Sequence, residues 1–330
     1  MKILGIDTSC DDTSVAVVEN GNRVLSSLLS SQVDVHRIFS GVVPEIAARK
    51  HLEAIIALVD EALRESQTAL SDIDAIAVTN RPGLVGSLLV GVGAAKGLSV
   101  AADKPVIAVD HIAAHIYSVH LTNEIPFPYI GLIVSGGHTL IVRVNAHNDY
   151  TVIGTTLDDA VGEAYDKIAK HLGLGYPGGP IIDKLAASGD ANAIKYPRAM
   201  LSGDDRYNFS FSGLKTAVVY QTPQCIRKGE NASMENIAAA FQESAVSVLY
   251  DKTLRYSRDS GISNVTVSGG VACNSYLRKK FSESRDFKAY IPERKYTTDN
   301  AAMVGGLGFH VKEKNDDRNI SCFSRVISRR

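Results

Sequence analysis

Two histidines four residues apart are the most specific chemical feature of the sequence. His111 and His115 follow residues 106–109, an apolar run typical of a buried strand. The i, i+4 spacing places both imidazoles on one helix face, within reach of one metal ion. Because α/β proteins bind ligands at the carboxyl ends of strands, this position favours a metal site over a surface pair. Asp299 is either a third ligand or the N-cap of the last predicted helix.

Two polar turns, residues 7–13 and residues 135–139, each separate two apolar runs typical of strands. Backbone N–H groups in such turns bind phosphate, and glycines let the backbone approach closely. A single turn of this kind is more often a plain hairpin, but two equivalent turns are more specific. The candidate contact residues are Asp7, Thr8, Ser9 and Asp11 in the first turn, and Ser135, Gly136, Gly137 and His138 in the second.

Residues 268–274 predict a strand-to-helix turn whose amides point outward from a helix N-terminus, where anions bind. Gly269 and Gly270 leave room for a flat ring or a phosphate, and Asn274 offers a hydrogen bond. The alternative is a plain turn in which Asn274 caps the following helix.

Acidic side chains gather after the second turn. Asp159, Glu163 and Asp166 are spaced i, i+4 and i+7, which predicts one shared helix face. Such a face is either a solvated surface or a set of acceptors for ribose hydroxyls. Asp183, which follows a glycine pair ending at Gly179, is a further carboxylate of this kind.

The order of apolar segments indicates an α/β protein with two lobes built on one plan. We expect strands at residues 3–6, 14–18, 75–78, 106–109, 129–134, 140–144 and 265–267, and helices at residues 45–63, 83–101, from 111 onward and 300–311. The expected lobes are residues 1–122, closed by residues 300–330, and residues 123–299, with a helical insertion at about 181–236.

The 330 residues are 45% apolar, which suffices for two cores, and carry a net charge of −1. We identify neither an apolar run long enough to cross a bilayer nor a signal peptide, and the four cysteines form no C-x-x-C pair. We therefore expect a cytoplasmic protein. A dedicated nucleic-acid binder is usually more basic. Local basic clusters are either solvated surface or RNA contacts: Arg278, Lys279, Lys280, Arg294, Lys295, Arg325, Arg329 and Arg330.

Together these motifs resemble those of the tRNA N6-adenosine threonylcarbamoyltransferase family (TsaD in bacteria), within the actin-like ATPase superfamily. The resemblance covers essentially the whole chain. It rests on residues 5–13, 43–49, 83–84, 111–115, 134–138, 158–167, 176–179, 211–215, 269–274 and 298–300. It implies a two-lobed actin-like (ASKHA) fold, with duplicated mixed sheets flanked by helices and an adenine nucleotide bound between the lobes.

The resemblance also implies an activity. The enzyme would move the threonylcarbamoyl group from threonylcarbamoyl-AMP to N6 of the adenosine 3′ of the anticodon, in tRNAs reading A-starting codons, and release AMP. The metal, Fe(2+) or alternatively Zn(2+), would be bound by His111, His115 and Asp299. The adenylate would contact Val134, Ser135, Gly136, Gly137 and His138, with its ribose and adenine held by Asp166, Gly179, Asp183 and Asn274. ATP, ADP or AMP are further candidates for that site, and His138 is a third candidate catalytic residue beside the two metal-binding histidines.

Members of this family act on tRNA with two partners, a non-catalytic paralogue of the same fold (TsaB-like) and a small P-loop ATPase (TsaE-like). The Gly- and Ala-rich helix predicted at 83–101 is either a docking face for such a partner or an internally packed helix. Asp7 stands where the family often has Glu, and Val134 stands where archaeal and eukaryotic cytosolic relatives have a tyrosine that reaches the metal. Valine cannot coordinate, which indicates a bacterial type of site with an open metal position.

Three other functions compete with this interpretation. A zinc endopeptidase of the His-Glu-x-x-His type needs a glutamate as general base, but Ile112 stands in its place. Sugar and acid kinases of the same fold lack the histidine pair. A non-catalytic scaffolding paralogue lacks both this pair and the adenosine-site motifs, which are intact here.

Overall fold

A computed structural model describes residues 1–39, 41–227, 232–311 and 320–324. It divides into two compact units. Unit 1 comprises Met1–Glu124, Ala146–Asp149 and Pro292–Arg330, and unit 2 comprises Ile125–Asn145 and Tyr150–Ile291. The basic residues Arg325, Arg329 and Arg330 lie outside the described residues.

Each unit contains a five-stranded mixed sheet, and the two sheets have the same topology. The strand orders are β3-β2-β1-β4-β5 and β10-β9-β6-β7-β8. In both, a hairpin is extended on one side by a third strand and on the other side by two parallel strands. The predicted duplication of mixed sheets is therefore confirmed.

The predicted strands of unit 1 are present, and β3 is an addition that the sequence did not reveal. The bounds are β1 Lys2–Asp7, β2 Asp12–Glu19, β3 Arg23–Ser31, β4 Ala75–Arg81 and β5 Val106–Asp110. The side chains of β3 are largely accessible, so its sequence lacks the apolar run that marks β1 and β2.

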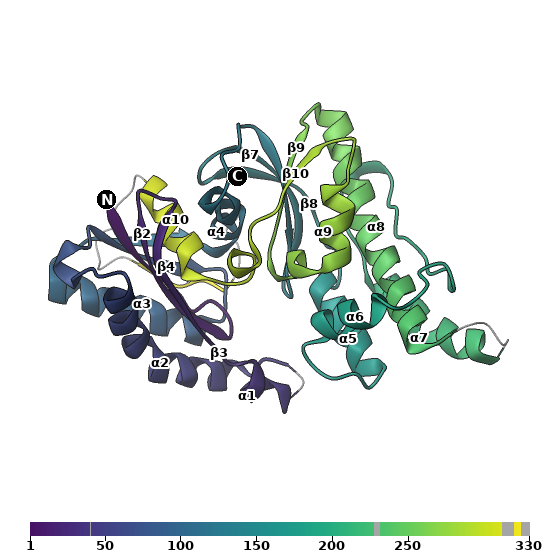
Figure 1. Cartoon of the computed structure of the whole chain (residues 1–330), viewed down its shortest axis with the longest axis horizontal. Helices are drawn as coiled ribbons and strands as arrows, with labels where there is room; N and C mark the ends of the chain where they lie inside the picture. Colours follow the sequence, from purple (N-terminus) through teal and green to yellow (C-terminus); the bar gives the residue numbers. More distant parts are fainter. Residues whose placement is uncertain (40, 228–231, 312–319, 325–330) are drawn as a thin grey trace. The chain divides into compact units, whose positions relative to one another are not determined.

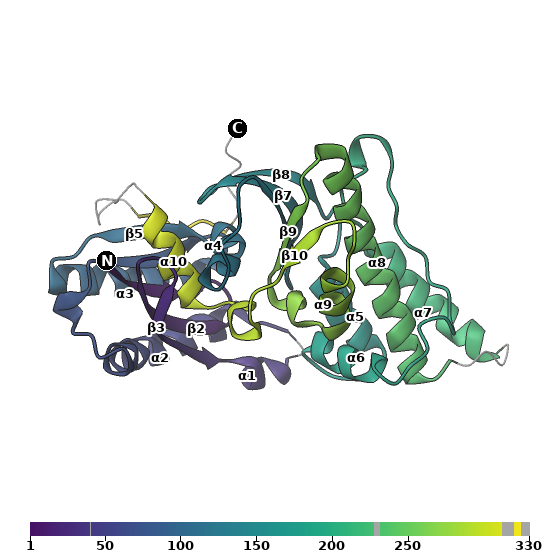
Figure 2. The same ribbon diagram turned by 45° about the horizontal axis from the view of Figure 1, so that its top comes forward.

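Helices cover both faces of this sheet. Figures 1 and 2 show α10 (Ala301–His310), near α4 (His111–Tyr117), on the face opposite α2 (Pro44–Glu65) and α3 (Val85–Ala102). Helix α10 thus brings the far end of the chain against the first strand, β1. The shorter helical segments of unit 1 are α1 Val33–Arg37, η1 Leu70–Asp72, η2 Ser118–Leu121 and η5 Arg294–Tyr296.

Helix α3 is long and apolar enough to span a membrane by length and composition alone. The expectation that the chain has no such run missed this helix, in which valines and leucines raise the mean hydropathy to 1.6 although glycines, serines and a lysine interrupt them. One face of α3, including Leu88, Gly91 and Ala95, is buried against α2 and the sheet.

Unit 2 packs helices α5 to α9 around its sheet in one apolar core. The strands are β6 Tyr129–Val134, β7 Thr139–Ala146, β8 Asp149–Thr155, β9 Asn264–Ser268 and β10 Lys288–Tyr290. The helical segments are α5 Val161–His171, α6 Gly178–Ala186, η3 Gly203–Asp205, α7 Ser212–Arg227, α8 Met234–Ser260, η4 Gly270–Cys273 and α9 Ser275–Ser282. The largest core side chains include Tyr165, Phe209, Phe211 and Phe241, all essentially inaccessible to solvent.

Two expectations for unit 2 need correction. Helix α5 begins at Val161, so Asp159 precedes it and does not share a helix face with Glu163 and Asp166. Asp159 instead pairs with Lys167 and Lys215. The predicted insertion at 181–236 is helical only in part, since its only helical turn from residue 187 to residue 211 is η3.

The approach of α10 to β1 depends on glycine at position 5. A Cβ atom on Gly5 would lie 2.3 Å from the carbonyl oxygen of Ala301 and 2.7 Å from the amide nitrogen of Gly305. We expect Gly5→Ala to lower the free energy of unfolding by about 1–3 kcal/mol or more, as overpacking does. Chemical denaturation measures this change.

The matched control is Gly93→Ala in α3, where a Cβ would meet no atom within 4 Å. This substitution should raise stability by up to about 1 kcal/mol, because alanine favours a helix over glycine. Equal effects of the two substitutions would contradict the packing argument.

Candidate functional site

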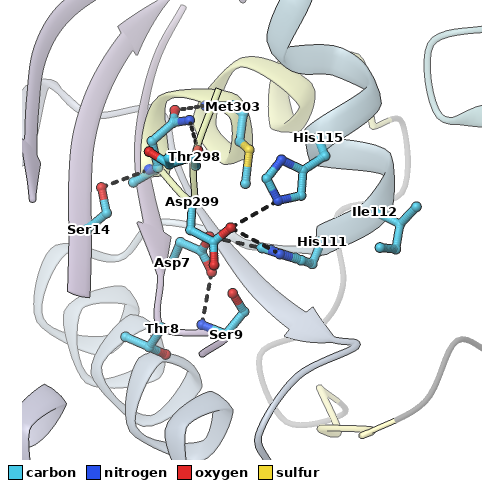
Figure 3. A network of polar contacts seen from close by, with 12 residues as sticks. Asp7, Thr8, Ser9, Ser14, His111, Ile112, His115, Thr298, Asp299 and Met303 are labelled. Carbon is cyan, nitrogen blue, oxygen red and sulfur yellow. Dashed lines mark hydrogen bonds and ion pairs between the residues drawn. The ribbon is translucent and has the colours of Figure 1, made fainter. Parts of the chain in front are cut away.

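Unit 1 brings His111, His115 and Asp299 together, with ligand atoms all within 4.8 Å of one another. One oxygen of Asp299, Oδ1, lies 3.0 Å from Nε2 of His115 and 3.6 Å from Nε2 of His111. Figure 3 shows this carboxylate facing both imidazoles, while Ile112 lies away from it. Two imidazole nitrogens and a carboxylate oxygen are a donor set that suits zinc or iron.

Helix caps hold these residues in place. Asp110 caps α4 by accepting hydrogen bonds from the backbone N–H groups of Ile112 and Ala113, which fixes the turn that carries His111. Asn300, and not Asp299, caps α10, because its side chain accepts from the N–H of Met303. The alternative role considered for Asp299 is therefore filled by its neighbour, and its carboxylate faces the histidines.

Asp7, at the end of β1, lies beside the same site. Its Oδ2 atom is 3.5 Å from Nδ1 of His111, and both side chains are buried. A carboxylate behind the second ring nitrogen of a metal-ligating histidine orients the ring and makes it more basic. The structure thus places Asp7 behind a candidate ligand.

Carboxylates dominate the electrostatics of this site. Burial alone would lower the pKa of His111, but Asp299 and Asp7 outweigh it and raise this pKa to about 9. Burial, with a contribution from Asp11 and Asp299, raises the pKa of Asp12 to about 7. Among the described residues, Oδ2 of Asp7 and Oδ1 of Asp12 are buried without a hydrogen-bond partner. A bound cation would attract these carboxylates and offset the repulsion between them, so the residues fit a metal.

Hydrogen bonds within the first polar turn and to helix α3 hold this turn in place. The hydroxyl of Thr8 donates to the carbonyl of Ser87, and the N–H of Ser9 donates to Asp7. Thr8 and Ser9 are buried, whereas Asp11 is half-buried. Thr8 therefore packs against α3 in this structure, and Asp11 is the more accessible candidate for ligand contact.

A buried network supports this turn from α2, and sequence reasoning missed it. His51 lies 3.0 Å from the carbonyl oxygen of Cys10 through Nε2 and 2.7 Å from the hydroxyl of Thr13 through Nδ1. A carbonyl only accepts, so Nε2 carries the proton and Nδ1 accepts from Thr13. The available signal was a histidine in line with Ala47 and Ile55 on the apolar face of α2.

In unit 2, the turn between β6 and β7 is closed by its own backbone. The N–H of Ser135 donates to the carbonyl of His138, and the N–H of His138 donates to Oγ of Ser135. Gly136 and Gly137 are exposed at the tip, with open space where a Cβ would stand. Val134, the last residue of β6, is fully buried.

The other candidates of unit 2 already have partners. Asp166 accepts a hydrogen bond from the N–H of Gly178, and Asp183 accepts from both the N–H and the hydroxyl of Ser275. Each carboxylate oxygen has a second lone pair, so a ribose hydroxyl could still bind. Gly179 has open space at its Cβ position.

The turn after β9 contains two features relevant to a ligand. Asn274 caps α9 by accepting from Leu277, and its amide donates to Gln242. The capping role considered for Asn274 is thus observed. Gly269 has a φ of +93°, and a Cβ there would lie 2.4 Å from the carbonyl oxygen of Val134. Both facts explain why this position requires glycine. Gly270 begins the short helix η4.

Comparison with known proteins identifies relatives along the whole chain. A family model described as "TsaD: tRNA N6-adenosine threonylcarbamoyltransferase" matches residues 23–306. The tRNA N6-adenosine threonylcarbamoyltransferase of Brachyspira hyodysenteriae is 64% identical over 332 residues, covering 100% of this chain and 98% of that protein. The enzymes of the same name from Treponema denticola and Bacillus subtilis are 51% and 49% identical, covering 96% and 95% of this chain and 94% and 91% of theirs.

Solved structures resemble the chain in fold. Full-length HypF in its phosphate- and nucleotide-bound form has a TM-score of 0.62 at 17% identity, covering 93% of this chain and 54% of that one. Component A of the Acidaminococcus fermentans (R)-2-hydroxyglutaryl-CoA dehydratase has a TM-score of 0.56 at 14% identity, covering 94% of this chain and 98% of that one. The predicted actin-like fold is confirmed.

Replacing Asp7 by Asn should weaken metal binding by about 10–100-fold, as loss of an outer carboxylate typically does. It should also lower the pKa of His111 in the metal-free protein, because one of the two carboxylates that raise it is neutralised. Chelator competition measures the affinity, and an NMR titration measures the pKa.

The control is Asp103→Asn, an exposed position of unit 1 with a left-handed backbone that asparagine tolerates. Metal affinity should be unchanged there. If Asp7→Asn bound metal as tightly as Asp103→Asn does, Asp7 would have no role behind His111.

Proposed function

The chain belongs to the tRNA N6-adenosine threonylcarbamoyltransferase family, and we propose that it uses the metal-ligand set of unit 1 and the glycine-rich turns of unit 2 for that reaction. As an acyltransferase of this family, it moves the threonylcarbamoyl group from threonylcarbamoyl-AMP to N6 of the adenosine 3′ of the anticodon. The substrates are tRNAs that read A-starting codons, and AMP is released.

The observation that carries the site assignment is the convergence of His111, His115 and Asp299 in unit 1. The proposed metal is Fe(2+), with Zn(2+) as the alternative. When bound, it would supply a Lewis acid that polarises the carbamoyl carbonyl. Val134 offers no side-chain ligand, in keeping with an open coordination position for substrate or water.

The protein's own groups bind and orient the reactants. Backbone N–H groups of the turn from Ser135 to His138 donate to developing negative charge, and each such donor is worth roughly 2.7–4 kcal/mol. The carboxylates of Asp166 and Asp183 accept hydrogen bonds from the ribose hydroxyls. Asn274 and Gly179 contact the adenine. His138 takes the proton from N6, or alternatively binds phosphate. The N6 amine is a weak nucleophile, so its positioning is a large part of catalysis.

Further contacts are proposed for the turn of unit 1 and for the start of η4. Thr8 and Ser9 are candidates for phosphate contacts, and Asp11 is a candidate for contact with a metal or water. Gly269 and Gly270 are candidates for contact with the nucleotide. ATP, ADP or AMP would use the same groups as the adenylate. We also propose that units 1 and 2 correspond to the two predicted lobes, and that the protein acts in the cytoplasm.

An endopeptidase is disfavoured by position 112. The general base of the His-Glu-x-x-His type would stand between the histidines, but Ile112 is apolar and buried. Metal-dependent acyl transfer needs no base at that position, because the adenylate is already activated.

His111→Ala should lose the metal and nearly all transfer. Loss of Lewis-acid stabilisation costs several kcal/mol, which is a fall of more than about 100-fold in rate. The assay supplies threonylcarbamoyl-AMP and unmodified tRNA to the chain, with and without its partner proteins, and measures the modified nucleoside.

His171→Ala, an exposed histidine at the end of α5, is the control and should keep full activity. Full transfer by a metal-free His111→Ala protein would sink the proposed role of the metal.

The non-catalytic paralogue is proposed to dock on α2 and α3. Leu52 and Ile56 on α2 are 69% and 55% exposed, and Val85 and Leu89 on the adjacent α3 are 45% and 57% exposed. Both pairs are spaced i, i+4, so each forms a ridge on one helix face. The outward Gly93 and Gly97 have open space at their Cβ positions, which permits close approach of another helix. A small P-loop ATPase is the second proposed partner.

Leu89→Asp should weaken association with the paralogue at least about tenfold, since it places a charge in an apolar interface. Sedimentation or calorimetry measures the affinity. The control is Val152→Asp on β8 of unit 2, an apolar position that is 47% exposed. Unchanged association of the Leu89→Asp chain would refute this docking face.

A further inference from the structure

An arginine with no role assigned above lies at the ligand-binding edge of the unit 1 sheet. Strands β1, β4 and β5 end at Asp7, Arg81 and Asp110 and are parallel neighbours in that order. Their carboxyl ends therefore lie at one edge of the sheet, which is where α/β proteins bind ligands. Arg81 ends the strand between the one that carries Asp7 and the one that leads into His111.

A β-bulge sets the position of this arginine. The register of β4 against β5 shifts between Thr79 and Arg81, so Asn80 is an extra residue in β4. The carbonyl of Asn80 accepts a hydrogen bond from the N–H of Phe323, and its side-chain amide donates to the carbonyl of Ser321. Bulges redirect side chains and are frequent beside active sites. The chain therefore holds a local irregularity in place directly before Arg81.

Asp110 binds one side of the guanidinium group and leaves the other side unused. Nε of Arg81 donates to Oδ2 of Asp110 at 3.2 Å, whereas Oδ1 of Asp110 accepts from two N–H groups at the start of α4. In the described part of the chain, Nη1 and Nη2 of Arg81 have no hydrogen-bond partner. The side chain is 25% exposed. Its terminal N–H groups form the planar fork that binds two oxygens of a phosphate or carboxylate.

The segment that follows Arg81 lies against the polar turn of residues 7–13. The N–H of Leu84 donates to the carbonyl of Ser9 at 2.9 Å, and a Cβ on Gly83 would lie 2.5 Å from the same oxygen. Glycine at position 83 thus permits close contact between this segment and the turn. Arg81 is therefore close in the chain to backbone that contacts a turn proposed to bind phosphate.

The charges at this edge favour an arginine as a partner for an anionic ligand. The carboxylates of Asp7 and Asp299 lie 3.5 and 3.6 Å from His111. They repel an anionic substrate group unless cations offset them. Arg81 carries a permanent positive charge. The carboxylate of Asp110 only partly neutralises this charge, because it is shared with the N–H groups of α4.

We propose that Arg81 is a further substrate-binding residue, whose Nη1 and Nη2 groups donate to a phosphate group. Asp110 is its positioning residue, because it fixes the guanidinium through Nε. The phosphate belongs either to the adenylate or to the tRNA backbone, which present the same oxygens to the fork. The proposal rests on the proposed function for these two substrates, and it does not depend on the metal.

The first test compares AMP with adenosine, which lacks the phosphate, by calorimetry on the full-length chain. Arg81→Gln should weaken AMP binding about tenfold or more, because it removes a charge-assisted hydrogen bond. Adenosine binding should be unchanged. Arg81→Lys, which keeps the charge but loses the fork, should recover only part of the affinity for AMP.

The second test measures tRNA binding at several salt concentrations, with the partner proteins present. If the phosphate belongs to tRNA, Arg81→Gln should leave AMP binding unchanged. It should then reduce the slope of log affinity against log salt by about 1, because one phosphate contact is lost.

The matched control is Arg23→Gln. Arg23 is also paired with a carboxylate, that of Glu19 at 2.8 Å. Glu19 pairs with Lys2 at the start of β1, so this ion pair lies at the opposite edge of the same sheet. The substitution should change neither AMP binding nor the salt dependence of tRNA binding.

Three outcomes would overturn the proposal. Arg81→Gln could match Arg23→Gln in both AMP binding and salt slope, or it could weaken AMP and adenosine equally, which indicates a structural role alone. The third is an unchanged chain that binds neither AMP nor tRNA. The proposed role of the metal has its own test in His111→Ala, so its failure is distinguishable from failure here.

Discussion

Backbone packing between α10 and β1 is the constraint on which the candidate metal site depends. Gly5 leaves no side chain between the two elements, so the carbonyl of Ala301 approaches the strand directly. The side chain of Ser14 then accepts a hydrogen bond from the N–H of Ala301, and Asn300 caps the helix. These contacts fix the start of α10, and Asp299 is thereby held against His115.

The sequence predicted the elements with strong periodicity and the residues with distinctive chemistry. Strands β1, β4 and β5 are continuous apolar runs, and α2 has a clear apolar face, so both kinds of element were foreseen. Strand β3 was missed because its side chains face solvent. Asp159 was wrongly placed on a helix, because i, i+4 spacing does not show where a helix begins. The pairing of Asp7 with His111 depends on how strands order in the sheet, which local patterns do not encode.

The family resemblance contributed what spacing could not. A His-x-x-x-His pair favours metal chemistry, but only the resemblance implied an adenylate and tRNA, and the relatives bear out that function. The structure adds electrostatic reasons for a cation in unit 1. The carboxylates of Asp299 and Asp7 raise the pKa of His111, and those of Asp11 and Asp299 help to raise the pKa of Asp12, so negative charge gathers around the candidate ligands.

The proposed metal ligands are separated in the chain by most of its length. Asp299 lies 184 residues after His115 in the sequence. It stands in the same unit as the sheet whose first strand begins at Lys2. A ribosome makes the histidines and the whole sheet of unit 1 well before it makes this aspartate. The complete ligand set can therefore form only late in synthesis, and a chain interrupted before residue 299 would lack both its third proposed metal ligand and helix α10.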